Sequence, residues 1–123
     1  EIIDAAVGHD AAEVMGLGPV PATQTLLRRN NLSANDIAAW EINEAFAIQV
    51  LASMQELAIA PERVNTWGGA LALGHPLGAS GLRLLITLLY RLAELGSDGE
   101  LGVATLCVGG GQGVSVLVRS VQP

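Results

Sequence analysis

The chain has 123 residues, a formal net charge of −6, and only 6 lysines and arginines together. This length is enough for one domain with a hydrophobic core, and the acidic balance excludes a nucleic-acid-binding surface, which needs a basic face. The single cysteine excludes an internal disulfide framework and fits a reducing compartment, so we expect a cytoplasmic location.

The core should be aliphatic and closely packed. Hydrophobic residues make up 50% of the chain and aromatic residues only 3%, and there are 15 glycines, which is well above the usual share. The longest apolar run, Leu84–Tyr90, is too short to span a bilayer, and no signal peptide is visible. Because the chain starts at Glu1 without a methionine, we expect it to be a piece of a longer protein.

The first half of the chain predicts two strand–helix units. In chain order the expected elements are a buried strand at Ile2–Val7, a turn-rich loop at Met15–Pro21, a helix at Ala22–Asn30, a strand at Ala38–Ile42 and a helix at Asn43–Ala58. The last of these helices rests on apolar residues at helical spacing, namely Phe46, Val50, Met54 and Leu57.

The second half predicts a short strand at Arg63–Thr66, a glycine-rich loop at Gly68–Gly74, a helix at Gly78–Leu95, and strands at Leu101–Val108 and Val114–Arg119. The last two strands are joined by a short glycine-rich connection, which predicts an antiparallel hairpin. The element order favours an α/β fold with a mostly parallel sheet that has an antiparallel end.

The helix at Gly78–Leu95 should be nearly surrounded by protein. Its polar residues form one narrow stripe, made of Arg83, Thr87, Arg91 and Glu94, and the remaining positions are apolar.

Asn43 lies where a strand becomes a helix. On position alone, the better interpretation is a helix N-cap that satisfies free backbone donors. The alternative is an amide that fixes a water or a substrate oxygen, since the start of a helix favours negative charge.

His75 lies in a tight loop between Gly74 and Pro76. A lone histidine in a loop is more often structural than catalytic, but glycines on both sides permit close approach of a ligand. A structural and a functional role are about equally favoured by the residues alone.

Cys107 is the only thiol and ends a predicted strand. It could be a small buried core residue. The following glycines Gly109, Gly110 and Gly111 favour a functional alternative, because N–H groups exposed in such a turn can bind an oxyanion. A thiol with a pKa near ~8.5 needs only modest tuning to act as an acid or base at neutral pH.

Three other site types are excluded by their patterns. The Gly109–Gly113 segment is neither a phosphate loop nor a dinucleotide fingerprint, and Gly78–Gly81 is one residue short of a nucleophile elbow. His9, His75 and Cys107 are too far apart in sequence to suggest a metal site, so we expect no metal and assign His9 no role.

Taken together, the motifs resemble the C-terminal domain of thiolases, the acetyl-CoA acetyltransferases and 3-ketoacyl-CoA thiolases. Asn43-Glu44-Ala45-Phe46, the segment Gly68–Gly81 and Cys107-Val108-Gly109-Gly110-Gly111-Gln112-Gly113 stand in the family's order, and Met15–Ala22 is similar to a fourth family segment. The resemblance covers essentially the whole chain, residues 1–123. Trp67 departs from it, because smaller residues are common at that position.

The resemblance implies a role for each motif. His75 corresponds to the histidine that activates a nucleophilic cysteine, and Cys107 to the second cysteine, which serves as acid and base. Asn43 corresponds to the asparagine that positions an oxyanion-hole water, and Gly109 to the glycine whose N–H group binds the acyl-enzyme oxygen. Residues corresponding to the lining of the acyl or pantetheine pocket are Met15, Ala45 and Phe46.

The nucleophilic cysteine itself belongs to an N-terminal half that this chain lacks. The implied activity is reversible Claisen condensation and thiolytic cleavage between acetyl-CoA and 3-ketoacyl-CoA, as in fatty acid metabolism. The implied partners are acyl-CoA, CoA and the N-terminal domain, in a homo-oligomer without nucleic acid or membrane. Coenzyme A thioesters are the substrates and no cofactor is expected. In a eukaryote the location would be mitochondrial or peroxisomal.

The implied fold is a mixed five-stranded sheet with helices on both faces, which forms half of a layered αβαβα arrangement. The Cys-x-Gly-Gly-Gly segment favours a true thiolase over the related decarboxylating condensing enzymes, which need no thiol at Cys107. A different hypothesis is a non-catalytic acyl-CoA-binding or interaction module that retains the fold. We expect the chain alone to be inactive and to self-associate.

Overall fold

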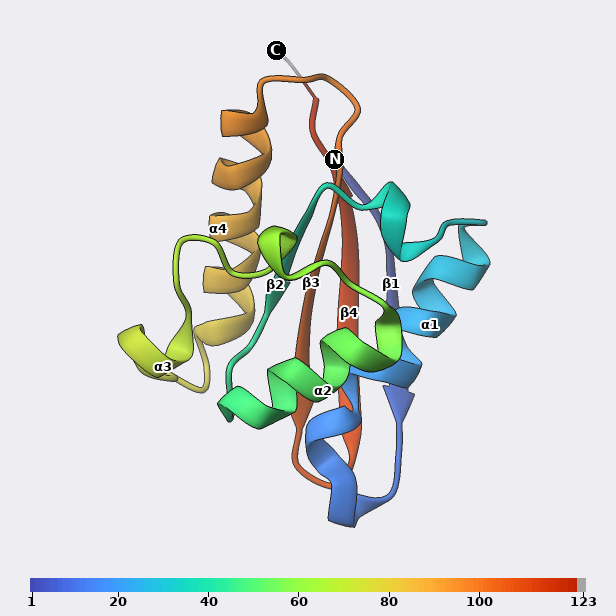
Figure 1. The fold of residues 1–123 in the computed structure, drawn as a ribbon, viewed down its shortest axis with the longest axis vertical. Helices are drawn as coiled ribbons and strands as arrows, with labels where there is room; N and C mark the ends of the chain where they lie inside the picture. The colour runs from blue at the N-terminus through green and yellow to red at the C-terminus, as the bar shows by residue number, and fades with distance from the viewer. Residues whose placement is uncertain (122–123) are drawn as a thin grey trace.

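The computed structural model describes residues 1–121, which form one four-stranded sheet with helices on both faces (Figure 1). The strands are β1 (Ile2–His9), β2 (Ala39–Ile42), β3 (Leu101–Val108) and β4 (Gln112–Arg119). Their order across the sheet is β1-β4-β3-β2. The pairs β1/β4 and β3/β4 are antiparallel, and β2/β3 is parallel. The predicted hairpin of the last two strands is thereby confirmed.

The expected five strands and mostly parallel sheet are wrong for the described residues. The sheet has four strands and one parallel pair, and the segment predicted as a strand at Arg63–Thr66 is reduced to an isolated bridge between Val64 and Trp40. Asn65 has a φ of 46°, which turns the backbone out of the extended conformation and ends the pairing there. β1 was expected to be buried, but it is an edge strand in which only Ala6 is buried.

The helices are α1 (Pro19–Arg29), α2 (Ala47–Leu57), the single turn α3 (Ala70–Leu73) and α4 (Ser80–Leu95), with short 3₁₀ helices η1 (Ala12–Leu17), η2 (Ala34–Asp36) and η3 (Pro61–Arg63). The loop predicted at Met15–Pro21 is therefore mostly helical. Proline stands at the start of α1, where its fixed φ suits the first turn and its missing N–H costs nothing.

Each face of the sheet has its own core. Along β3 the side chains alternate, so that Val103 packs beneath α1 and α2 while Ala104 packs beneath α4. On the first face Leu26 and Trp40 are completely buried, and on the second face Leu88 is. Gly102 lets α4 lie close to the sheet, because a Cβ atom there would come within 2.8 Å of Leu88.

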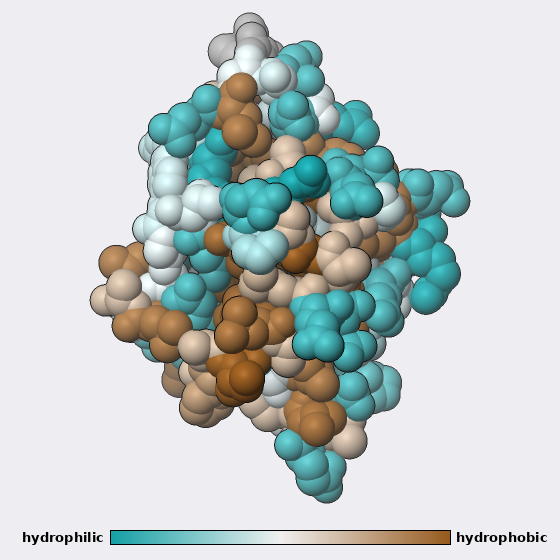
Figure 2. Space-filling view, in the orientation of Figure 1, coloured by the Kyte–Doolittle hydropathy of each residue, from teal (hydrophilic) through white to brown (hydrophobic). Residues whose placement is uncertain are grey.

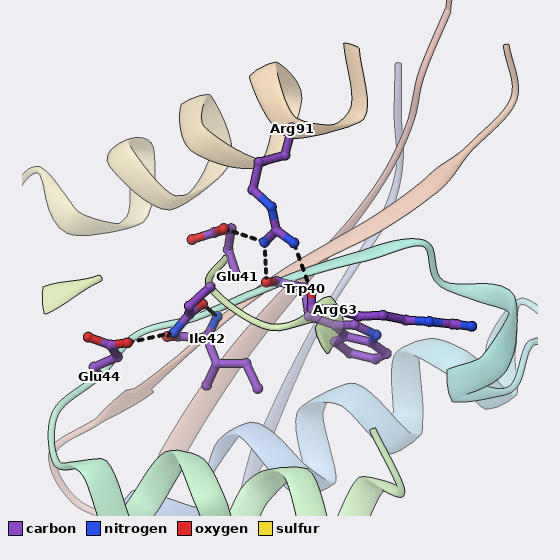
Figure 3. A network of polar contacts seen from close by, with 7 residues as sticks. Trp40, Glu41, Ile42, Glu44, Arg63 and Arg91 are labelled. Atoms are coloured by element: carbon purple, nitrogen blue, oxygen red, sulfur yellow. Dashed lines mark hydrogen bonds and ion pairs between the residues drawn. The ribbon is translucent and has the colours of Figure 1, made fainter. Parts of the chain in front are cut away.

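Beneath α4 lies a buried ion pair (Figure 3). The guanidinium of Arg91 contacts the Glu41 carboxylate at 2.5 Å and donates hydrogen bonds to the backbone oxygens of Trp40 and Arg63. Burial raises the pKa of the Glu41 carboxyl above its usual value, and the hydrogen bond from Arg91 opposes this rise. Arg91, which belongs to the predicted polar stripe of this helix, therefore points toward the sheet and binds α4 to β2.

The outer side of α4 is not covered by this chain. Ile86, Leu89 and Tyr90 are all exposed, Tyr90 by 65%. The expectation that this helix is nearly surrounded by protein is thus not met within the described residues. None of the helices within residues 1–121 is long and apolar enough to cross a bilayer.

Candidate functional site

Asn43 and Cys107 lie at the same end of the sheet. β2 and β3 run parallel with Ile42 opposite Thr105, and the Asn43 N–H donates a hydrogen bond to the Thr105 carbonyl at 2.9 Å. Cys107 follows Thr105 by two residues on β3. The two motifs are therefore held at the carboxyl ends of neighbouring parallel strands, an edge where ligand sites of α/β proteins are common.

Asn43 is not a helix cap. α2 begins at Ala47, with Phe46 as its N-cap residue. The Asn43 side chain is only 2% exposed, and its Oδ1 atom is buried without a hydrogen-bond partner among the described residues. Leaving such an acceptor unpaired costs roughly 1–3 kcal/mol, so it is expected to meet a water or a ligand donor. The geometry therefore favours the second interpretation of Asn43, in which its amide fixes a water or a ligand.

His75 lies in the exposed segment between α3 and α4, and its ring is oriented by Ser80. The Ser80 hydroxyl is 2.6 Å from His75 Nδ1 and donates to the Pro76 carbonyl at 3.1 Å. A hydroxyl has one hydrogen, so Ser80 accepts from the ring and Nδ1 carries the proton. The neutral ring then has its lone pair on Nε2, which is free to act as a base.

Cys107 is buried, with 9% of its surface exposed. Burial raises the pKa of its thiol, and a backbone hydrogen bond lowers the pKa to a smaller extent. The group is therefore a thiol at neutral pH. The turn after it is formed by Gly109, Gly110 and Gly111, and the last two have φ values of 85° and 86°, which favour glycine. Gly109 is exposed in this turn.

The predicted pocket residues differ in exposure. Met15 lies in η1 and, like Ala45, is half-buried, whereas Phe46 is 62% exposed. Other exposed apolar residues flank the Asn43 and His75 segments in the chain: Ile48, Leu51, Leu71, Leu73 and Leu77. Figure 2 shows apolar surface gathered over α3 and the start of α2. Contiguous exposed apolar surface is typical of sites that contact a ligand or another protein segment.

The His75 segment is fastened to the same edge as Asn43. The carboxylate of Glu44 accepts a hydrogen bond from the N–H of Leu71, and Arg83 donates to the Gly74 carbonyl at 2.8 Å. No hydrogen bond links His75 directly to Cys107 within residues 1–121. In the same residues no three His, Cys, Asp or Glu side chains gather as metal ligands.

Sequence reasoning missed Ser80, Arg83 and Glu44 as supports of the site. Glu44 stood inside a motif already singled out, and Ser80 lies five residues after His75, so local signals existed for both. Arg83 was placed in a polar stripe, and nothing in the sequence shows that it reaches the Gly74 carbonyl.

The sequence model of the family "Thiolase, C-terminal domain" matches residues 2–120. Over 113 residues, which are 90% of this chain and 28% of the relative, the chain is 55% identical to the β-ketoadipyl-CoA thiolase of Pseudomonas knackmussii. It is 51% identical to the cytosolic acetyl-CoA acetyltransferase of Rattus norvegicus, over 86% of this chain and 26% of the relative.

Among solved structures, human mitochondrial 3-ketoacyl-CoA thiolase in complex with CoA superposes with a TM-score of 0.93 at 40% identity, over 98% of this chain and 30% of that one. The chain thus spans 26–30% of the length of these relatives.

Proposed function

Because this chain belongs to the thiolase C-terminal domain family, we propose that it is the C-terminal part of an acyltransferase that joins or cleaves acyl-CoA molecules. The reaction would be reversible Claisen condensation and thiolytic cleavage between acetyl-CoA and a 3-ketoacyl-CoA. The observation that carries the proposal is the placement of the Asn43 and Cys107 motifs at one edge of the sheet, to which Glu44 fastens the His75 segment.

His75 is the base in this proposal. With Nδ1 bound to Ser80, Nε2 takes the proton of a nucleophilic cysteine supplied by the N-terminal half of the longer protein. The thiolate attacks the thioester carbonyl and forms an acyl-cysteine, and CoA leaves with a proton.

Cys107 transfers the second proton. As a thiolate it removes a proton from the α-carbon of acetyl-CoA, and as a thiol it returns one to that carbon in the cleavage direction. The pKa of its thiol is raised by burial in this chain, so the proposed enzyme must stabilise the thiolate when substrate and the missing half are in place.

Asn43 and Gly109 stabilise negative charge on the thioester oxygens. The unpartnered Oδ1 of Asn43 is an acceptor, so it suits a water whose hydrogen it binds and whose other hydrogen points at the oxyanion. The N–H of Gly109, in the turn after Cys107, is the donor proposed for the acyl-enzyme oxygen. Met15, Ala45 and Phe46 would contact the acyl chain or the pantetheine arm of CoA.

The outer side of α4 is the surface where the N-terminal half would pack, giving the layered αβαβα arrangement. Ile86, Leu89 and Tyr90 supply the exposed apolar area for this contact. The longer protein is proposed to act as a homo-oligomer in the cytoplasm or, in a eukaryote, in a mitochondrion or peroxisome. The 123-residue chain alone should be inactive, and light scattering should show it self-associated.

The proposal is tested on the full-length protein with acetoacetyl-CoA and CoA. Replacing His75 with alanine should lower turnover by about 10²- to 10⁴-fold, the range of a general base, and His9→Ala should leave it unchanged. Cys107→Ser should abolish α-proton exchange but keep acyl-enzyme formation. Loss of acylation with exchange intact would reverse the role of Cys107, and turnover by the 123-residue chain alone would contradict the missing nucleophile.

A further inference from the structure

The carboxylate of Glu44 joins the two segments that carry Asn43 and His75. Its Oε1 accepts a hydrogen bond from Asn65 Nδ2 at 3.1 Å, and its Oε2 accepts one from the Leu71 N–H at 2.9 Å. Glu44 directly follows Asn43, and Leu71 precedes His75 by four residues. One side chain therefore spans the distance between the two parts of the site.

Asn65 anchors this carboxylate to the sheet. Its amide accepts from the Ile42 N–H and donates to the Ile42 carbonyl, both at 2.8 Å, and its own N–H donates to the Trp40 carbonyl at 3.0 Å. Figure 3 shows Glu44 beside the backbone of Ile42. The φ of 46° at Asn65 is a left-handed conformation that most residues other than glycine avoid, and these contacts maintain it.

The backbone of the His75 segment is shaped to fit the carboxylate. A Cβ atom at Gly69 would lie 2.5 Å from the carboxyl carbon of Glu44, so a larger residue at this position would displace the carboxylate. The φ of Gly69 is −150°, which any residue adopts, so conformational freedom is not the reason for the glycine. At the far end of α3 the Arg83 guanidinium holds the Gly74 carbonyl.

We propose that Glu44 and Asn65 are positioning residues that hold His75 and Asn43 in one arrangement relative to the reacting thioester. This inference rests on the proposed function, because it takes His75 as the base and Asn43 as the holder of the oxyanion-hole water. Loss of the Glu44 carboxylate leaves the Leu71 N–H without its acceptor and leaves the Asn65 amide bound to Ile42 alone, so the His75 segment then samples other positions. A displacement of about 1 Å at a catalytic group can lower the rate 10²-fold.

The test uses the full-length protein with three variants and one control. Glu44→Ala removes both acceptors, Glu44→Gln keeps one acceptor oxygen, and Asn65→Gly removes the amide but permits the left-handed backbone. Glu56→Ala, at an exposed position near the end of α2, is the matched control. Turnover of acetoacetyl-CoA and hydrogen exchange of residues 70–75 are measured for each.

Glu44→Ala and Asn65→Gly should each lower kcat about 10- to 100-fold, with KM changed less than about 3-fold. The double variant should lower kcat little further, because the two residues act as one unit. Glu44→Gln should recover part of the loss. Exchange at Leu71 should accelerate in Glu44→Ala while β3 and β4 keep their protection.

Unchanged kcat in Glu44→Ala and Asn65→Gly would overturn the inference, and so would unchanged exchange at Leu71. Because exchange reports whether the Leu71 N–H stays hydrogen-bonded and needs no turnover, it separates this inference from the proposed function, which the wild-type assay tests by itself. If Glu44→Ala fails to fold, Glu44→Gln and Asn65→Gly still decide the outcome.

Discussion

The face of the sheet under α1 and α2 differs from the face under α4 in how completely this chain covers it. On the first face Leu26, Ile37 and Trp40 are all completely buried, between two helices and the sheet. On the second face one helix buries Leu88 against the sheet and leaves Leu89 exposed by 46% on its other side.

A surface helix and a helix of a central layer therefore have different sequence patterns. α1 has an apolar side toward the sheet and polar residues outside, which is enough for a surface helix. α4 is apolar on both sides, a pattern that is stable only if a second layer covers the outer one. On its inner side α4 is held to the sheet by the Arg91–Glu41 ion pair, whereas α1 is held to the first face by a buried contact between the hydroxyls of Thr23 and Ser115.

Loss of that anchor should have the largest effect on stability. Arg91→Met leaves the Glu41 carboxylate buried without its cation, which costs about 3–5 kcal/mol of unfolding free energy. Urea denaturation followed by tryptophan fluorescence, to which Trp40 and Trp67 both contribute, measures this. Arg29→Met is the control, because the Arg29–Asp4 pair is exposed and exposed pairs contribute at most about 1 kcal/mol.

The pair itself is tested by a second change. Replacing Glu41 with leucine in the Arg91→Met background removes the uncompensated charge and should restore most of the lost stability. A cost of less than about 1 kcal/mol for Arg91→Met alone would show that α4 does not depend on this anchor.

The elements that could be predicted from the sequence are those that depend on residues close together in the chain. The helix expected at Gly78–Leu95 and the hairpin of β3 and β4 are confirmed, because period and turn residues specify both locally. The start of α2 was wrong by four residues, since Asn43 is held by the Thr105 carbonyl on β3 and not by the helix. Local sequence propensity cannot report this hydrogen bond, because Asn43 and Thr105 are 62 positions apart in the chain.

Prediction of the strand pairing and of the site was limited by contacts between residues that are distant in the chain. Pairing of β1 with β4 joins the two ends of the chain, and strand order in sequence does not reveal its direction. The motifs supplied the candidate residues His75, Cys107 and Asn43 as residue types. Asn65 was missed as a further support of the site because it contacts Ile42 and Glu44, which lie more than twenty residues away in the chain.

The next largest effect is expected for a leucine beneath α1, compared with a leucine on the outer side of α4. Leu26→Ala, at 0% exposure beneath α1, should cost about 2–5 kcal/mol by lost burial and cavity formation. Leu89→Ala, on the outer side of α4, should change stability of the 123-residue chain by no more than about 0.5 kcal/mol at dilutions where light scattering shows the chain to be monomeric. The same urea titration measures both, and equal costs would mean that the outer side of α4 is already covered, for instance by self-association.

In the full-length protein the costs of Leu26→Ala and Leu89→Ala should become similar. If the N-terminal half packs on α4, Leu89→Ala should become as costly as a core substitution there. If Leu89→Ala still changes the unfolding free energy by almost nothing, the N-terminal half does not pack on the outer side of α4.

The smallest effect concerns Cys107 at the carboxyl end of β3. Burial raises the pKa of its thiol, so in the folded 123-residue chain its reaction with iodoacetamide should reach half its maximal rate at a pH above that of the unfolded chain. The urea-unfolded chain is the control, with the ordinary pKa of about 8.5.

A folded pKa of the Cys107 thiol above the unfolded value means that the thiol contributes stability below the unfolded pKa, and that this contribution is lost as pH rises through the folded pKa. The unfolding free energy should therefore fall at alkaline pH, and Cys107→Ala should remove this part of the fall. A thiol that is alkylated readily at neutral pH would show instead that it already has the lowered pKa of a catalytic base, without substrate or the missing half.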